Sequence, residues 1–270
     1  LFLISVISFV VIQLPPGDYL TTLVASLASQ GEQVDPVALQ ALRERYGLGQ
    51  PIYVQYYKWI SGIVLRGDFG QSFAWNMAVS DLIWERLALT FVLSFASLIF
   101  IWVVAFPIGI YSAVKQYSMG DYFATFIGFV GLATPNFLLA LVLMYVAFKY
   151  FGQSVGGLFS PEYQDAPWGW GKLLDLLAHI WIPVVIIGTE GTAGLIRVMR
   201  ANLLDELRKP YVVTARAKGL PEWKVILKYP VRLALNPFIS TVGWVLPGLV
   251  SGAAIISIVL SLPTTGPLLI

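Results

Sequence analysis

Few side chains in this sequence could carry catalytic chemistry. The chain of 270 residues has no Cys and a single His, His179, which excludes a disulfide framework, thiolate catalysis and a Cys- or His-rich metal site. One carboxylate, Glu190, lies inside a long apolar run, within the sequence Gly-Thr-Glu-Gly-Thr. One His and one such carboxylate form neither a paired-carboxylate site nor a Ser-His-Asp triad. We therefore expect no catalytic residues, no metal site and no enzyme.

The apolar runs that surround Glu190 predict an all-α membrane protein. The chain is 57% hydrophobic, 12% charged and has a mean hydropathy of +0.76, whereas about a quarter of the residues in a soluble domain are charged. Four runs, at residues 87–114, 122–148, 176–196 and 233–270, contain one charged residue among them, Glu190. Each is long enough to cross the hydrocarbon core, which takes about 20 residues. We expect spans at 86–114, 121–148, 175–199 and 233–260.

A fifth apolar run, at residues 1–12, is too short to cross a membrane. We expect it to be the end of a first membrane helix that starts before this sequence, which makes five helices in a polytopic bundle. The last four contain Pro or Gly, which membrane helices tolerate when neighbours satisfy the freed backbone groups. The spacing of Gly188, Gly191 and Gly194 favours close packing of helices, and bending during a conformational change is the alternative.

The distribution of basic residues predicts the orientation. Cytoplasmic loops are enriched in Lys and Arg, and residues 197–232 contain nine basic and three acidic residues. This loop is therefore expected inside, and residues 13–85 and 149–175 outside. We divide the chain into the end of a first helix (1–12), an external segment (13–85) and a membrane core (86–270) that carries the basic loop at 200–232.

The external segment is expected to contain two short helices. Asp35 is a good N-cap, Pro36 suits the first helical position and Gly47 a helix stop, which predicts a helix at 36–46. After Pro51, apolar residues recur at helical spacing up to Val64. We interpret that stretch as an amphipathic helix.

The basic loop has the pattern of two helices joined by a tight turn. Residues 211–218 contain no helix breaker, and Gly219 can end a helix because it adopts positive φ readily. Pro221 and Glu222 suit the first turn of a second helix. The pattern fits a rigid cytoplasmic projection, and it fits equally a basic amphipathic helix on anionic lipid.

The segment from Thr214 to Leu220, Thr-Ala-Arg-Ala-Lys-Gly-Leu, resembles the cytoplasmic "EAA" loop of permeases from bacterial ATP-binding-cassette importers. It is most similar to the loop of the dipeptide/oligopeptide family. Residues 14–18, 42–51 and 67–72 resemble further motifs of that family in the same order. Two positions depart from the pattern: Val213 stands where it begins with Glu, and residues 262–266 read Leu-Pro-Thr-Thr-Gly instead of Trp-Pro-Gly-Leu-Gly.

The resemblance implies the transmembrane subunit of a type I importer in the bacterial inner membrane, with a sixth helix expected after this sequence. It implies that the loop helix docks on a separate ATPase chain, through Tyr211, Thr214, Ala215, Arg216, Ala217, Lys218 and Gly219. This chain has no G-x-x-x-x-G-K-[ST] phosphate loop, so it should bind no cofactor, with ATP and Mg held by partners. The implied partners are a second homologous permease, two ATP-binding subunits, an external substrate-binding protein and membrane lipid, without nucleic acid.

We assign the translocation pathway to Glu190, Thr189, Thr192 and Trp244. A carboxylate within a membrane segment is costly and by default marks function, although Glu190 could instead pair with a threonine or with the partner permease for packing. The family favours di- or oligopeptides as the substrate. Since the spans offer no charge besides Glu190, an oligosaccharide stays open. The alternative from another class is a gradient-driven transporter or channel with a lipid-binding basic loop.

Overall fold

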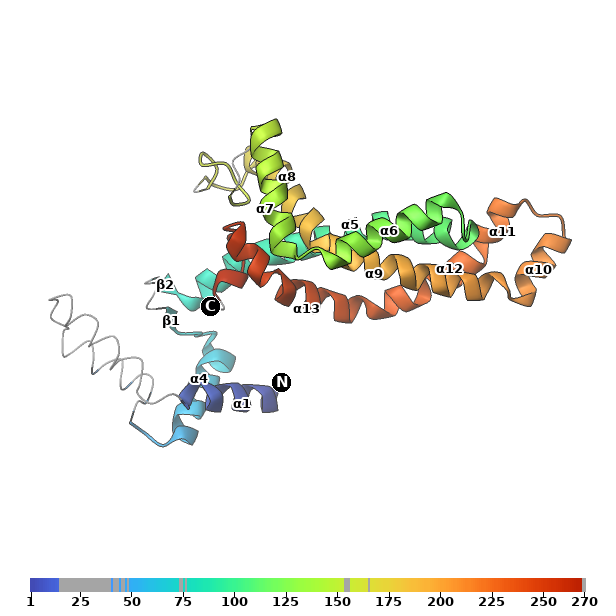
Figure 1. The fold of residues 1–270 in the computed structure, drawn as a ribbon. Helices are drawn as coiled ribbons and strands as arrows, with labels where there is room; N and C mark the ends of the chain where they lie inside the picture. The colour runs from blue at the N-terminus through green and yellow to red at the C-terminus, as the bar shows by residue number, and fades with distance from the viewer. Residues whose placement is uncertain are drawn as a thin grey trace. The chain divides into compact units, whose positions relative to one another are not determined.

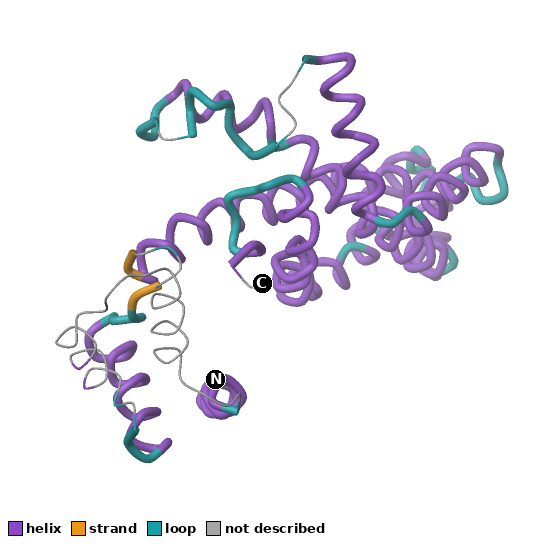
Figure 2. Tube along the Cα trace, turned by 60° about the vertical axis from the view of Figure 1, so that its left-hand side comes forward, coloured by secondary structure: helices purple, strands orange, loops and turns teal. Residues whose placement is uncertain are grey.

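The computed structural model describes residues 1–14, 40, 44, 47, 49–72, 75, 77–152, 156–164 and 166–268. Within these ranges, the side chains of residues 151, 190, 237, 241, 244–246 and 251–253 are not described. The chain forms two compact units, Leu1–Leu82 and Ile83–Ile270. Helices make up nearly all of the regular structure that Figure 2 shows.

The first unit contains helix α1 (Phe2–Gln13), helix α4 (Ile52–Arg66) and a two-stranded antiparallel ribbon of β1 (Gln71–Ser72) and β2 (Met77–Ala78). Phe9 of α1 packs on α4, with ring centroids 5.4 Å from Tyr56 and 5.5 Å from Trp59. The amphipathic helix predicted after Pro51 is confirmed, and it ends at Gly67 with φ of 64°. The helix expected at 36–46 lies outside the described residues, apart from Gln40 and Glu44.

The second unit is a bundle of long apolar helices (Figure 1). Its membrane part consists of α5 (Val79–Val114), α6 (Met119–Ala133), α7 (Asn136–Val146), a π-helical turn (Ala147–Phe151), α8 (Trp170–His179), α9 (Trp181–Leu207) and α13 (Asn236–Val259). Three shorter helices precede α13: α10 (Pro210–Ala217), α11 (Glu222–Lys228) and α12 (Pro230–Ala234). A 3₁₀ turn at Gly266–Leu268 follows it.

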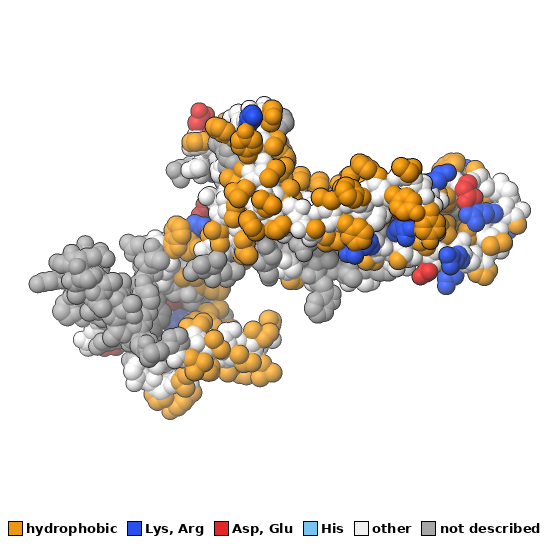
Figure 3. Space-filling model, viewed as in Figure 1, with side chains coloured by type: hydrophobic (Ala, Val, Ile, Leu, Met, Phe, Trp, Pro, Cys, Tyr) orange, Lys and Arg blue, Asp and Glu red, His pale blue; other side chains and the backbone are white. Residues whose placement is uncertain are grey.

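The predicted helical membrane bundle is confirmed. In the part of the chain that the structure describes, Val79–Val114 and Trp170–Thr189 are long and apolar enough to cross a membrane. A third span results if the bent pair α6 and α7 is counted as one, and shorter apolar helices occur at Phe2–Gln13 and Pro247–Val259. Large apolar side chains cover the surface along the bundle (Figure 3), as expected for helices that face lipid or other membrane helices.

The expectation of one helix at 121–148 was wrong, because this segment forms two helices, α6 and α7. The segment is bent by 103° between α6 and α7, at Thr134 and Pro135. Thr134 has φ of −82° and ψ of 120°, because the ring of a following proline disfavours the helical region. The hydroxyl and the amide of Thr134 both donate to the carbonyl of Val130. Pro107 and Pro247, in contrast, lie inside continuous helices.

Two further boundaries differ from the expectation. The span expected at 175–199 is divided at Ile180 into α8 and α9, and α9 continues to Leu207. The span expected at 233–260 starts with the short helix α12 and continues as α13. We expected the helix to end at 199 because charged residues follow. A helix can leave the membrane without ending, and α9 continues through these charged residues.

Small residues let α9 approach α5 closely. A methyl group added at Gly188 would lie 2.5 Å from a ring carbon of Phe100, and one at Gly191 would lie 2.7 Å from Ile101 Cδ1. At Gly194 it would meet nothing within 4 Å. The packing interpretation therefore holds for the first two of the three glycines. The same contact includes Gly109 on α5, which faces Met199 of α9.

We predict that Gly109→Ala destabilises the protein by about 1 to 3 kcal/mol through overpacking. The added Cβ would lie 2.8 Å from Met199 Cβ and 3.2 Å from the carbonyl oxygen of Ile196. The matched control is Gly194→Ala, which has open space and should leave stability equal or slightly higher. Thermal unfolding of the purified permease in detergent measures both. Equal melting temperatures for the two variants would contradict the proposed contact.

Candidate coupling loop and membrane groove

The basic loop folds as two helices joined at a glycine. Helix α10 starts with Pro210 at its first position, where the missing amide hydrogen costs nothing. Gly219 follows the helix with φ of 76°, in the left-handed region where glycine is favoured. Pro221 then precedes the first residue of α11. The predicted arrangement of helix, glycine turn and helix is confirmed to within about a residue of its expected boundaries.

A small apolar core holds α10 and α11 together. Val212 and Val225 are completely buried and Ala215 nearly so, and the side chains of Tyr211, Leu220 and Tyr229 surround them. A helix that lies on lipid would direct its apolar residues away from the protein. These residues instead point into the loop, so the contacts favour the rigid projection over the lipid-bound alternative. We call the segment from Pro210 to Lys228 the coupling hairpin.

Two polar contacts brace the coupling hairpin. The Tyr211 hydroxyl donates a hydrogen bond to the Glu206 carboxylate at the end of α9. Burial of the ring and the adjacent carboxylate raise the pKa of Tyr211 to about 12. Across the glycine turn, Arg216 Nε and Nη2 lie 3.1 Å and 2.6 Å from Glu222 Oε1. Those hydrogen bonds hold the pKa of Glu222 below its usual value, but the exposed pair contributes at most about 1 kcal/mol.

The outer face of the hairpin consists of different residues from the inner core. Of the seven residues predicted to contact an ATPase, Tyr211 is half-buried and Ala215 is buried, so both point into the protein. The exposed members are Thr214, Arg216, Ala217, Lys218 and Gly219. Val213 and Trp223, which is 62% exposed, add apolar surface that sequence reasoning missed. Basic and apolar side chains alternate at this end of the bundle (Figure 3).

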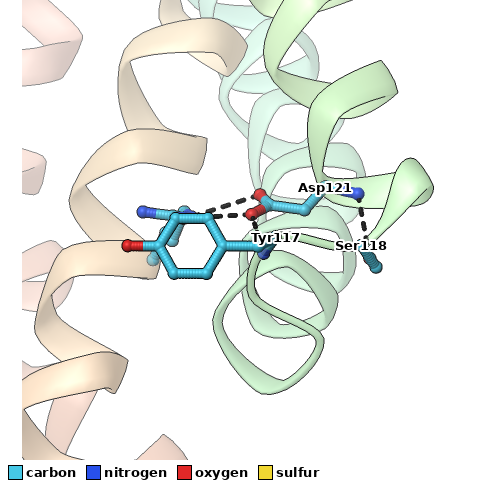
Figure 4. Close-up of polar contacts among 4 residues, drawn as sticks. Tyr117, Ser118 and Asp121 are labelled. Carbon is cyan, nitrogen blue, oxygen red and sulfur yellow. Dashed lines mark hydrogen bonds and ion pairs between the residues drawn. The ribbon is translucent and has the colours of Figure 1, made fainter.

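An ion pair with a buried carboxylate joins α9 to the start of α6. Arg200 of α9 donates from Nε and Nη2 to the two carboxylate oxygens of Asp121, over 3.2 Å and 3.0 Å. Asp121 Oδ2 also accepts from the backbone amide of Tyr117, and the Asp121 amide donates to Ser118 Oγ (Figure 4). The Asp121 side chain is only 4% exposed. In the sequence, Asp121 is a charged residue directly before the apolar run at 122–148. We interpreted it as the end of a loop and did not predict its ion pair.

A groove of about 510 Å³ lies between α5, α6 and α9. Thr189 and Thr192 line it, opposite Gly131 of α6 and Phe100 of α5. Thr189 Oγ1 donates to the carbonyl of Val185 over 2.6 Å, which satisfies it within its own helix. Thr192 Oγ1 is buried and has no hydrogen-bond partner among the described residues. The rest of the lining is almost entirely apolar.

The structure thus brings together two of the four residues assigned to the pathway. Glu190 lies in α9 and Trp244 in α13, but both side chains lie outside what the structure describes. No cluster of three or more His, Asp or Glu side chains that could hold a metal ion occurs in the described ranges.

We predict that Asp121→Ala lowers stability by up to about 3 kcal/mol, since removing one partner leaves the other charge uncompensated. The double variant Asp121→Ala with Arg200→Met should lose less than the single variant, because no unpaired charge remains. Thermal unfolding of both proteins provides the comparison. A double variant as unstable as the single one would show that the loss does not come from an uncompensated charge on Arg200.

We predict that Tyr211→Phe costs about 1 kcal/mol, the net value of one hydrogen bond. Because the pKa of Tyr211 is raised from 10.0 to about 12, its contribution is complete below pH 10 and is lost as the pH rises through about 12. The difference in unfolding midpoint between wild type and variant should therefore be constant from neutral pH to about pH 9. A difference that shrinks within that range would contradict the assignment.

Comparison with known proteins agrees with these features. The family described as "Binding-protein-dependent transport system inner membrane component" matches residues 105–270, and the corresponding N-terminal family matches residues 1–94. The oligopeptide transport system permease protein AppB of Bacillus subtilis is 35% identical over 269 residues, which cover 99% of this chain and 81% of that protein. The dipeptide transport system permease protein DppB of Alkalihalophilus pseudofirmus is 31% identical, over 97% of this chain and 80% of its own.

A third relative, the inner membrane ABC transporter permease protein YejB of Escherichia coli O157:H7, is 35% identical over 76% of this chain and 57% of its own length. The two family models and the match to AppB together cover both units of the chain. The chain belongs to the family of inner membrane components of binding-protein-dependent transport systems, the permease subunits of ABC importers.

Proposed function

We propose that this permease forms half of the translocation pathway of an importer for di- or oligopeptides. AppB and DppB are named for oligopeptides and dipeptides, and these names give no support to the oligosaccharide alternative. The second half of the pathway is a homologous permease. An external binding protein delivers the peptide, and two ATP-binding subunits hold ATP and Mg.

The coupling hairpin carries the proposal, because it is a braced projection with its own core. Its exposed face, formed by Val213, Thr214, Ala217 and Lys218, is the surface that docks on an ATPase. Tyr211 and Ala215 act differently from our first expectation, since they hold the helix in place from the inside. The remaining two predicted residues, Arg216 and Gly219, shape and clamp the turn.

Movement of the hairpin reaches the membrane through α9. This helix runs without a break from Trp181 to Leu207, and its end is joined to the hairpin by the bond between Glu206 and Tyr211. The Arg200 and Asp121 pair joins α9 to α6. A push on the hairpin therefore moves α9 and α6 together, and these two helices line the groove that contains Thr189 and Thr192.

The proposed orientation places the hairpin in the cytoplasm, in agreement with its nine basic residues at 197–232. Residues 13–85 and 149–175 then face outward. Within the pathway, Thr189 and Thr192 form part of the wall of the groove, and Glu190 and Trp244 are assigned to the same pathway from α9 and α13.

We predict that Ala217→Glu abolishes association with the ATPase without lowering the stability of the permease. Ala217 is exposed on α10, so a carboxylate there disturbs a partner and no internal contact. The test is co-purification of the ATPase subunits with the full-length permease, together with peptide-stimulated ATP hydrolysis by the assembled importer. Gln116→Glu, in the loop between α5 and α6, adds the same charge outside the hairpin and serves as the matched control.

Two results decide whether the hairpin is the docking surface. Loss of the ATPase with Ala217→Glu and retention with Gln116→Glu supports docking at the hairpin. Retention of the ATPase with Ala217→Glu would place the docking surface elsewhere on the permease.

A further inference from the structure

A second amphipathic surface lies on the outer side of helix α11. Trp223 and Leu227 are 62% and 50% exposed, and one helical turn separates them, so they share a face of the helix. Lys224 and Lys228 are exposed and have the same spacing. We call these four residues the α11 face. It differs from the surface proposed to dock on the ATPase, which lies along α10.

Aromatic rings hold the lysine side chains of this face. Lys224 Nζ lies 5.3 Å from the ring centroid of Trp223, and Lys228 Nζ lies 5.7 Å from that of Tyr229. A lysine can lay its methylene stem along an apolar surface while its ammonium stays in polar surroundings. A helix face that combines Trp and Leu with lysines is typical of the boundary between membrane and water.

The sequence from Trp223 onward carries positive charge only. Residues 223–270 contain no Asp or Glu, and Glu222, just before them, is hydrogen-bonded to Arg216. Every side chain from 191 to 236 is described, and within this range neither lysine of the α11 face forms an ion pair. Arg232, exposed on α12, adds a third positive charge before α13. Basic residues directly on the cytoplasmic side of a membrane helix attract anionic lipid.

The inner side of α11 shows at which depth this helix lies. Ile226 of α11 and Val231 of α12 belong to one buried cluster with Ala113 of α5. Ala113 is in the last turn of α5, and the apolar run of that helix ends one residue later. Helix α11 therefore packs against the cytoplasmic ends of the membrane helices, at the depth of the lipid headgroups. The buried cluster of α10, in contrast, is formed by residues 211–229.

The turn between α5 and α6 has a similar composition. Tyr117 and Tyr122 are exposed, and Lys115 precedes them. This turn follows directly after Ala113, which reaches the inner side of α11 through the buried cluster. Tyrosine is enriched at membrane interfaces and lysine in cytoplasmic loops. Two segments thus present aromatic and basic side chains at the level of the inner headgroups.

We propose that the α11 face binds anionic phospholipid headgroups of the inner leaflet, with its two lysines contacting the phosphates and its two apolar side chains entering the headgroup region. The inference rests on the proposed orientation, in which this end of the unit is cytoplasmic. It divides the loop into two surfaces, α10 for the ATPase and α11 for the membrane. The core of the hairpin stays inside, because Val225 and Ile226 occupy the opposite side of α11.

The first experiment counts the lipids bound to the assembled importer by native mass spectrometry. The full-length permease is purified in detergent with its partner subunits, and phosphatidylglycerol or phosphatidylcholine is titrated in. Wild type should bind phosphatidylglycerol in preference to phosphatidylcholine. Lys224→Gln combined with Lys228→Gln should weaken that binding about 25-fold, since each basic residue near an anionic lipid surface contributes about fivefold.

The matched control is Arg208→Gln combined with Lys209→Gln, which removes two exposed positive charges between α9 and α10. It should keep the preference for phosphatidylglycerol. No preference in wild type, a preference that survives the double variant on α11, or an equal loss in the control would each overturn the proposal.

A second measurement locates the α11 face directly. Because the chain contains no Cys, a nitroxide can be attached at Leu227→Cys or, as the control, at Arg208→Cys, in an importer with cysteine-free partners in nanodiscs that contain phosphatidylglycerol. Paramagnetic resonance compares collisions with oxygen, which dissolves in lipid, and with a nickel chelate, which stays in water. The label on α11 should favour oxygen, and the control label should favour the nickel chelate.

Two results of this measurement would contradict the lipid contact. A label on α11 that meets the nickel chelate as readily as the control label does would show that this face is in water. A label on α11 that is shielded from both reagents only when the ATPase subunits are present would show that the face contacts the ATPase instead.

The outcomes separate this inference from the proposed function. Co-purification of the ATPase and peptide-stimulated hydrolysis test the importer, its orientation and its cargo. If both are found and the α11 face shows no lipid contact, the importer stands and the lipid surface falls. If the lipid contact is found and no peptide stimulates hydrolysis, the surface stands and the assignment of peptides as cargo falls.

Discussion

The ion pair between Arg200 and Asp121 is the contact on which the packing of α9 against the start of α6 depends. It joins α9 to the beginning of α6, and the carboxylate also holds the backbone of the turn at Tyr117. Charge is costly in a buried place unless it is paired and hydrogen-bonded, and here both carboxylate oxygens have partners. The pair thus joins the start of α6 to α9, and a separate hydrogen bond from Tyr211 to Glu206 joins the hairpin to the end of α9.

The need to hydrogen-bond every backbone amide and carbonyl explains why the apolar part consists of long helices. In lipid each free amide or carbonyl costs several kcal/mol, so long helices dominate, and a break is tolerated only where local groups replace the lost bonds. At the 103° bend between α6 and α7, the Thr134 hydroxyl and amide use the carbonyl of Val130. Pro135 forces its predecessor out of the helical region. The bend also places α6 beside α9, where both line the groove.

The two ends of the membrane unit use charge differently. At the hairpin, basic residues are exposed and braced by hydrogen bonds from Arg216 and Tyr211, as suits a surface that meets another protein. At the opposite end, the ammonium of Lys172 is buried beside the rings of Phe159 and Trp168 and donates to two backbone carbonyls.

The sequence by itself determined the membrane class, the helical bundle, the helix, glycine and helix pattern of the hairpin and the amphipathic helix after Pro51. These features depend on hydropathy, periodicity and the φ preference of glycine, which are properties of neighbouring residues. Only the tertiary structure decided that Ala215 points inward while Ala217 points outward, that a helix ends before Pro135 whereas Pro107 lies inside one, and that Lys172 is buried. The partners Asp121 and Arg200 stand 79 positions apart. Such pairings arise from packing between distant segments, and no local pattern contains them.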